Sequence, residues 1–253
     1  MILSLTTNQI SAFKTSFEVL DSLITEVNLE ISITGIVIRE VNKSSKLLVS
    51  LNLPAENFDT YEYTYGFESY NLGLDVSSIT SKLKTPLKYD SLTLKVSSKK
   101  VTLLLENFQR KEKKHLVLKT TTSCPCTTPS ITPVEYAVSI CISSDLLTKY
   151  TKELNRSSET FTITVAGEDE FVLELSNSET SFHLYESKFM SVFYDILYDE
   201  RVEVSSTLIA TYFCILSKLG NLSEFVNIYL SPDTFTSVKY QLGSLGTFTV
   251  VLL

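Results

Sequence analysis

The chain has 253 residues, of which 43% are hydrophobic and 20% charged, and 22 Lys and Arg against 29 Asp and Glu give a net charge of −7. This balance excludes a disordered chain, a collagen and a coiled coil, and the length suits one large domain or two of about 125 residues. No apolar run approaches the roughly 18 residues of a membrane span, and Met1–Leu5 lacks the basic start of a signal peptide. We therefore expect a soluble intracellular protein with no membrane partner.

The first half of the chain alternates predicted helices with predicted strands. Apolar residues at spacings of three and four predict helices over Ile10–Leu20 and Val76–Leu83, and Pro86 ends the second helix. Alternation over Leu29–Ile33, followed by Gly35, predicts a tight hairpin. The same alternation predicts further strand structure over Leu47–Leu53 and Leu92–Leu105.

A stretch rich in Thr, Ser and Pro, Lys119–Pro133, separates the two halves and predicts an extended surface connector. After it, the spacing predicts a helix over Leu146–Leu154, with Ser143–Asp145 as its N-terminal cap. Another helix is expected from about Thr207 to Leu219, ending at Gly220. Strand structure is expected over Phe161–Val165, Phe171–Leu175, Phe225–Leu230 and Val238–Leu253.

The two halves echo each other, which indicates an internal duplication. The pairs Ile31 with Ile163 and Gly35 with Gly167 share a separation of 132 residues, and similar pairs continue to the end of the chain. A near-constant separation is typical of an internal repeat. We therefore predict an α+β fold of two similar β-rich domains with two helices each, residues 1–118 and 135–253, joined by a connector over residues 119–134.

The residues that usually carry chemistry are scarce. The two histidines, His115 and His183, lie in no metal-binding spacing, and the seven glycines form no phosphate-binding loop. Of the four cysteines, Cys124, Cys126, Cys141 and Cys214, the first two are too close together for a Cys-x-x-Cys zinc motif. We expect reduced thiols, no metal, no cofactor and no enzymatic activity.

Several short motifs resemble a known family. Phe58–Tyr61 reads FDTY, Leu23–Gly35 joins a helix exit to a hairpin, and Leu74–Ile79 opens a helix. Glu135–Tyr136 closes the connector, and Tyr240–Leu242 precedes Leu245–Gly246 in the last hairpin. This combination resembles the eukaryotic-type sliding clamp family, proliferating cell nuclear antigen.

The resemblance implies a closed ring of three identical subunits that encircles double-stranded DNA without regard to sequence. Helices would line the hole, and sheets would form the outside and the subunit joints. Such a protein tethers DNA polymerase and other replication and repair proteins through a clamp-binding motif, and a clamp loader places it on DNA. It performs no covalent chemistry and needs no cofactor or metal.

An acidic protein threaded by DNA needs its positive charge inside the hole. Lys149, Lys152 and Arg156, spaced three and four apart, fall on one stripe of the third predicted helix and coincide with basic positions of the family. The resemblance adds four further candidates for DNA contact, namely Lys14, Lys82, Lys84 and Lys218. Because the net positive charge of the four helices is small, we expect weak, salt-sensitive binding that depends on ring closure.

The resemblance also implies an apolar pocket for client motifs. Its expected residues are Val41, Leu48, Ile131, Tyr136, Val251 and Leu253. Two departures from the family predict an altered motif preference. The chain stops at Leu253, without the usual proline and acidic tail, and the connector carries Thr, Ser, Pro and Cys in place of acidic and apolar residues.

The subunit joint is expected to pair a strand near Arg110–Leu118 with a strand near Asn177–Leu184 of the next subunit in a head-to-tail contact. Glu186 lies near the second strand. The residues assigned to this joint are basic Arg110, Lys111, Lys113 and Lys114 on one side, and Glu179 with Leu184 on the other.

Two alternatives keep the same fold. One is a checkpoint-clamp-like protein or one member of a hetero-oligomeric ring, and the other is a monomeric viral polymerase or transcription accessory factor. The resemblance implies a nuclear location, or a viral replication site in the cytoplasm if the protein is viral.

Overall fold

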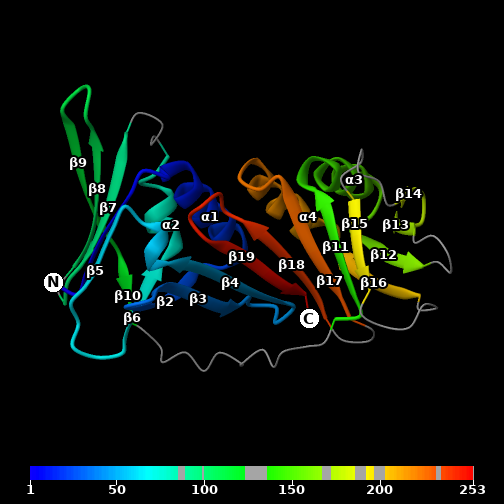
Figure 1. The fold of residues 1–253 in the computed structure, drawn as a ribbon, viewed down its shortest axis with the longest axis horizontal. Helices are drawn as coiled ribbons and strands as arrows, with labels where there is room; N and C mark the ends of the chain where they lie inside the picture. Colours follow the sequence, from blue (N-terminus) through cyan, green and yellow to red (C-terminus); the bar gives the residue numbers. More distant parts are fainter. Residues whose placement is uncertain are drawn as a thin grey trace. The chain divides into compact units, whose positions relative to one another are not determined.

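The computed structural model describes residues 1–84, 89–98, 100–122, 136–166, 172–185, 192–196, 203–231 and 235–252 (Figure 1). The chain forms two compact units. Unit 1 comprises Met1–Ser44, Leu48–Thr128 and Leu242–Phe248; unit 2 comprises Ser45–Leu47, Pro129–Gln241 and Thr249–Leu253. Each unit therefore combines segments that are far apart in the sequence. The predicted domain boundaries at residues 118 and 135 stay a prediction.

Unit 1 contains two antiparallel sheets and two helices. One sheet has the strand order β5-β1-β7-β8-β9, and the other contains β10-β6-β2-β3-β4. Their strands are β1 (Leu3–Thr7), β2 (Glu26–Ser32), β3 (Gly35–Val41), β4 (Leu47–Pro54), β5 (Thr60–Tyr63), β6 (Ser69–Asp75), β7 (Ser91–Val96), β8 (Val101–Asn107), β9 (Glu112–Leu118) and β10 (Thr120–Thr121). The helices are α1 (Ile10–Leu23) and α2 (Val76–Thr80), with a 3-10 turn, η1, over Ala55–Asn57.

Unit 2 repeats this plan. One sheet has the order β14-β13-β12-β16, and the other contains β18-β17-β11-β15. Its strands are β11 (Val138–Ser143), β12 (Thr160–Ala166), β13 (Val172–Ser176), β14 (Ser181–Tyr185), β15 (Val192–Ile196), β16 (Val204–Ile209), β17 (Phe225–Leu230) and β18 (Thr236–Gln241), followed by β19 (Thr247–Leu252). The helices are α3 (Ser144–Ser157) and α4 (Ala210–Leu216), and a 3-10 turn, η3, follows over Ser217–Asn221.

The two units correspond strand by strand. β1 pairs with β5 and β7 as β11 pairs with β15 and β17, and β2 pairs with β3 and β6 as β12 pairs with β13 and β16. A helix of 14 residues follows the first strand of each plan, and a shorter helix follows β6 and β16. The predicted fold class, two similar β-rich domains with two helices each, is confirmed.

Aromatic pairs anchor the core of each unit. On α1, the predicted apolar stripe is buried, and the rings of Phe13 and Phe17 lie 4.7 Å apart between centroids. In unit 2, Phe161 of β12 and Phe213 of α4 pack edge to face at 5.1 Å. Both residues are at most 1% exposed, so the sheet and the helix share one apolar interior.

Some sequence-based boundaries are wrong. The helix predicted from about Thr207 begins only at Ala210, because residues up to Ile209 form β16 and Thr207 lies opposite Thr162 of β12. Ile33 does not continue the buried alternation: β2 ends at Ser32, and Ile33 is 75% exposed in the turn. The strand Leu3–Thr7 was not predicted.

The cap of α3 and the bounds of α2 also differ from expectation. Ser143 makes no side-chain cap on α3, and Ser144 instead donates its hydroxyl proton to the carbonyl of Ser223. α2 ends at Thr80, earlier than predicted, and its cap is the Asp75 carboxylate, which accepts the Ser77 N–H at 3.0 Å. Pro86, the predicted stop for this helix, lies outside the described residues.

Gly35 at the start of β3 provides a test of the hairpin geometry. Its φ is +141°, and an added Cβ would lie 2.3 Å from the Leu53 carbonyl oxygen. We expect Gly35→Ala to lower the free energy of unfolding by about 2 kcal/mol or more, because it combines backbone strain with overpacking. Chemical denaturation followed by circular dichroism measures this. The matched control is Gly66→Ala, which meets nothing within 4 Å and should stay within about 0.5 kcal/mol of the parent. Equal effects would contradict the described hairpin.

Candidate nucleic-acid interface and strand edges

Helix α3 separates its apolar and basic residues onto different faces. Ser144, Leu147, Thr151 and Leu154 are buried. Leu146 and Tyr150, which the sequence places on the core stripe, are only half-buried. The side chains of Lys149, Lys152 and Arg156 are all exposed. The predicted basic stripe is therefore exposed on one face of this helix, where the exposed Glu153 also lies, four residues after Lys149 and three before Arg156.

Two of the cations on α3, Lys149 and Lys152, have described neighbours within unit 2. The Lys149 ammonium is 5.5 Å from the centre of the Tyr150 ring, which stacks at 4.4 Å on Phe182 of β14. Burial raises the pKa of the Cys214 thiol on α4, and the nearby Lys152 ammonium partly opposes this rise. Lys152 thus lies near Cys214 of α4. Lys218, in η3 after that helix, is exposed as well.

The cations of unit 1 are more strongly engaged within their own unit. Lys14 on α1 is half-buried and forms an ion pair with Glu18 at 3.6 Å. Lys82, just beyond α2, donates to the backbone carbonyl of Val117 in β9. Lys84 is exposed. Helix α3 consequently presents the clearest surface for phosphate groups among the described helices.

The residues expected for the client pocket are divided between the two units. Val41 and Leu48 lie opposite each other in the β3–β4 register, with Leu48 buried and Val41 half-buried. In unit 2, Tyr136 stacks on Tyr229 at 5.2 Å, and Val251 is buried. Ile131 and Leu253 lie outside the described residues. The structure thus brings Val41 and Leu48 together and does not test the set as a whole.

The two strands expected at the subunit joint, β9 and β14, each have one sheet neighbour among the described strands, β8 and β13 respectively. Both are therefore edge strands among the described residues. Val117 on β9 is 56% exposed, and Tyr185 on β14 is 55% exposed. These two apolar side chains were missed from the sequence, although each stands at an outward position of its strand.

The charged residues assigned to the joint have distinct positions. Arg110 and Lys111 lie in the turn before β9, Lys113 forms an ion pair with Glu106 at 2.6 Å, and Lys114 is half-buried. Glu179 is exposed in the β13–β14 turn. Leu184 is only 2% exposed, which corrects the expectation for its side chain: it packs in the core of unit 2, leaving only its backbone at the edge. Glu186 lies outside the described residues.

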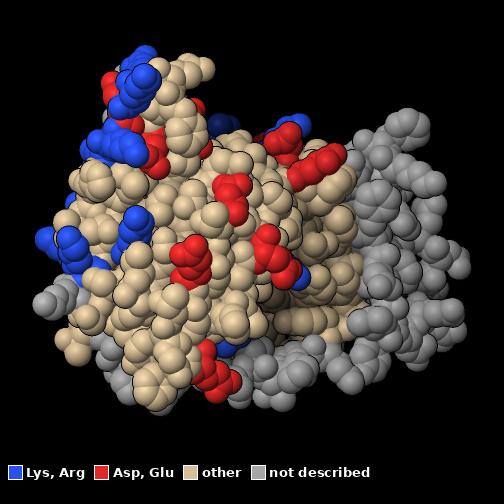
Figure 2. Space-filling model, turned by 60° about the vertical axis from the view of Figure 1, so that its left-hand side comes forward, with Lys and Arg blue, Asp and Glu red and all other residues tan. Residues whose placement is uncertain are grey.

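Figure 2 shows how charge is distributed over one face of the molecule. Lys and Arg side chains gather at the top left, where some Asp and Glu side chains lie among them, and along the left side, and further Asp and Glu are scattered across the middle. No group of three metal-binding side chains occurs among the described residues. Within the same residues, no helix is long and apolar enough to cross a membrane.

Comparison with known proteins agrees with this architecture. Residues 2–122 match the family model described as "Proliferating cell nuclear antigen, N-terminal domain". The chain is 24% identical to the DNA polymerase sliding clamp of Methanococcus vannielii, over 95% of this chain and 94% of the relative. It is 21% identical to the probable DNA polymerase sliding clamp 1 of Paramecium bursaria Chlorella virus 1, over 97% of this chain and 94% of the relative. It is 27% identical to the proliferating cell nuclear antigen of Chaetomium thermophilum, over 93% of this chain and 91% of the relative.

The fold and these matches define a DNA sliding clamp, the class predicted from the sequence. Within this class, residues 2–122 resemble the N-terminal domain of proliferating cell nuclear antigen. The resemblance stated from the sequence is confirmed. A role in DNA replication follows from the family.

The contact between α3 and α4 is testable through Cys214. Burial raises the pKa of this thiol and the Lys152 ammonium lowers it, so Lys152→Ala should raise the pKa further. Because the thiolate is the reactive form, alkylation of Cys214 near neutral pH should slow by a few-fold, and its pH–rate profile should move to higher pH. Peptide-resolved mass spectrometry measures the rate. Cys141, whose pKa is raised by burial alone, is the internal control, and equal slowing at both sites would contradict the contact.

Proposed function

We propose that this protein is the subunit of a homotrimeric ring that encircles double-stranded DNA and holds DNA polymerase at its template. It acts as a processivity factor without catalysis, cofactor or metal. The proposal divides the chain into clamp domains over residues 1–118 and 135–253, joined by the connector 119–134. A nuclear location, or a viral replication site in the cytoplasm, is part of the same proposal.

The strand topology of the repeat carries the ring proposal. Within unit 1, the segment Leu242–Phe248, which opens β19, lies against β4: an added Cβ on Gly246 would be 2.1 Å from the Asn52 carbonyl oxygen. By the correspondence between units, β9 is the counterpart of β19, and β14 is the counterpart of β4. Both counterparts are edge strands among the described residues. A contact between β9 of one subunit and β14 of the next would therefore reproduce a contact that the chain already makes.

The side chains at these edges suit such a joint. Val117 and Tyr185 supply exposed apolar surface on the two strands. Lys113 and Lys114 lie on β9, whereas Glu179 lies beside β14. Apolar contacts with a complementary charged rim are typical of a specific interface. Only the backbone of Leu184 belongs to this proposed contact, and Arg110 with Lys111 precede the strand.

The exposed stripe on α3 supports sequence-independent contact with DNA. Lysine and arginine side chains that face phosphates release counterions on binding, which makes the affinity salt-dependent. We propose Lys149, Lys152 and Arg156 as the main contacts. Lys14, which is paired with Glu18, and Lys82, which donates to Val117, are weaker contributors. The full proposed set is Lys14, Lys82, Lys84, Lys149, Lys152, Arg156 and Lys218.

Polymerase and other clients would bind through a short motif with apolar anchors, and a clamp loader would open the ring. The proposed pocket residues are Val41, Leu48, Ile131, Tyr136, Val251 and Leu253. Of the two proposed pocket residues in unit 1, Val41 on β3 is the more accessible: it is half-buried, whereas Leu48 opposite it is buried. Apolar side chains of this kind suit the aliphatic and aromatic anchors of a hot-spot pocket.

The oligomeric state tests the ring directly. Light scattering over a concentration series should give a mass of about three times 28.4 kDa. Val117→Asp and Tyr185→Asp should each weaken assembly at least tenfold, about 1.4 kcal/mol, because each buries a charge in the joint. Ile33→Asp, at an exposed apolar position in the β2–β3 turn, is the control and should leave the trimer intact. A parent protein that stays monomeric at high concentration would favour a hetero-ring subunit or a monomeric accessory factor.

Retention on circular DNA tests the α3 stripe. We expect the Lys149→Ala, Lys152→Ala, Arg156→Ala triple variant to slide off primed circular DNA faster, by about tenfold, with a weaker dependence on salt, while remaining trimeric. The control removes three exposed lysines away from the four helices, Lys43, Lys95 and Lys100. Retention of the triple variant equal to that of the parent protein would exclude the stripe as the DNA contact.

A further inference from the structure

The tip of the β8–β9 hairpin is a firmly held turn. Asn107 at the end of β8 lies opposite Glu112 at the start of β9, so the turn is Phe108–Lys111. The backbone N–H of Phe108 donates to the Asp90 carboxylate at 2.7 Å, and that of Arg110 donates to the Asn107 side chain at 2.7 Å. Asp90 is itself fixed, because its backbone N–H donates to the Glu106 carbonyl at 2.8 Å. These bonds define the direction in which the turn presents its side chains.

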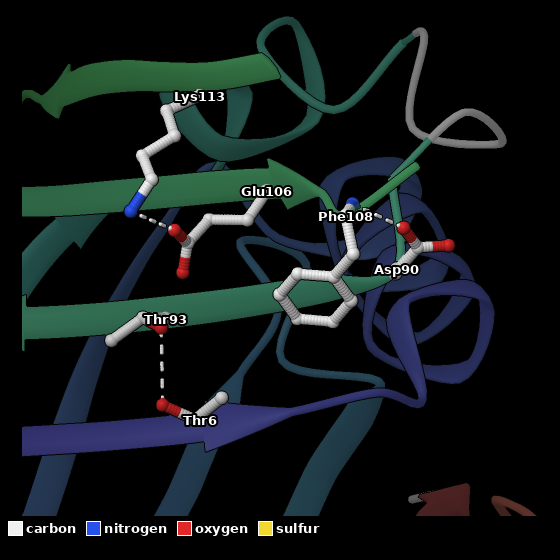
Figure 3. Close-up of polar contacts among 6 residues, drawn as sticks. All are labelled: Thr6, Asp90, Thr93, Glu106, Phe108 and Lys113. Carbon is white, nitrogen blue, oxygen red and sulfur yellow. Dashed lines mark hydrogen bonds and ion pairs between the residues drawn. The ribbon is translucent and has the colours of Figure 1, made fainter. Parts of the chain in front are cut away.

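The turn nevertheless exposes a large apolar ring. Phe108 is 64% exposed, although its backbone is bonded on one side. Figure 3 shows the Asp90 carboxylate reaching the backbone nitrogen of Phe108, with the aromatic ring pointing away from that carboxylate. Burying a phenylalanine ring stabilises a protein by about 1.5–3 kcal/mol relative to leaving it exposed. This ring contributes little of that amount to the fold.

Lysine occupies the strained position of the turn. Lys111 has a φ of +53°, in the left-handed region, where glycine or asparagine would be favoured. A non-glycine residue in this region costs of order 1 kcal/mol. The turn thus keeps a cationic side chain where a smaller residue would be more stable. Strain of this kind is often found at functional positions.

The cations at the tip are not neutralised by their own unit. The Lys113 ammonium is paired with Glu106, as Figure 3 shows, whereas the side chains of Arg110 and Lys111 form no ion pair among the described residues. Both are exposed, and the four residues of the turn contain no acidic side chain. Two exposed cations therefore follow one exposed aromatic ring in a hydrogen-bonded turn, and the exposed Glu112 comes directly after them.

We propose that the hairpin tip Phe108–Lys111 binds single-stranded nucleic acid, with a base stacked on the Phe108 ring and neighbouring phosphates held by Arg110 and Lys111. Bases in a duplex are already stacked, so an exposed ring on a rigid turn selects a strand whose bases are free. Cations beside it follow the phosphate backbone without reading sequence. The site is separate from the helices proposed for duplex DNA, and it does not depend on ring formation.

The test is fluorescence anisotropy of a labelled twelve-nucleotide oligothymidylate with the full chain. We expect Phe108→Ala to weaken binding by about fivefold or more, because stacking is worth about 1–3 kcal/mol per base. An abasic oligonucleotide of equal length should bind the parent protein as weakly as the thymidylate binds this variant. The Arg110→Ala, Lys111→Ala double variant should reduce the slope of log affinity against log salt by about 1.4, at about 0.7 per lost phosphate contact.

Matched controls separate this site from others. Phe67→Ala removes another exposed aromatic ring, 72% exposed, and the Lys95→Ala, Lys100→Ala variant removes two exposed cations from the β7–β8 region; neither should affect binding. Unchanged binding by Phe108→Ala, equal binding of the abasic strand, or loss only in the α3 triple variant would each overturn the proposal. So would stronger competition by a glutamate-rich peptide than by the unlabelled oligonucleotide, which would indicate an acidic protein partner. Trimer mass and retention on circular DNA, measured on Phe108→Ala, report separately on the proposed clamp function.

Discussion

Hydrogen bonding along strand edges is the constraint on which this structure depends. Every β-strand presents two rows of backbone donors and acceptors, and a strand at the end of a sheet leaves one row without a partner. In the described structure, β9 and β14 each lie at the end of an antiparallel sheet, and the Val117 carbonyl on β9 accepts a hydrogen bond from Lys82. Val117 and Tyr185 add exposed apolar surface to these two strands, and a partner strand would bury it. The ring proposed here satisfies the backbone and the side chains at once.

The sequence predicted those elements whose pattern is set locally. The helix α1 was predicted because its buried residues recur at helical spacing, and the β2–β3 hairpin was predicted because Gly35 interrupts alternating apolar residues. The start of α4 was misplaced because Leu208 and Ile209 fit either a strand or a helix. Pairing of β16 with β12 decides in favour of the strand, and this long-range interaction has no local signal.

The site residues also divide into those that local spacing could predict and those that depend on contacts between distant parts of the chain. Spacing alone placed Lys149, Lys152 and Arg156 on one helical face, and the structure places all three in solvent. It could not indicate that Lys82 donates to the Val117 carbonyl, because the two residues are 35 positions apart and meet only through folding. Nor could it indicate that the Leu184 side chain is buried in unit 2, because the segment Asn177–Leu184 was assigned to the joint as one strand.

The repeated strand plan has a consequence for assembly. The segment that opens β19 lies against β4 of the same chain, so their encounter is intramolecular and independent of protein concentration. In the proposed ring, β9 meets β14 only when two chains collide, so that contact follows mass action. Geometrically similar joints would then differ in strength through chain connectivity alone. Dilution would open the contacts between chains and leave those within a chain closed. DNA would then enter the proposed ring between two chains, because only that contact lacks a covalent link across it.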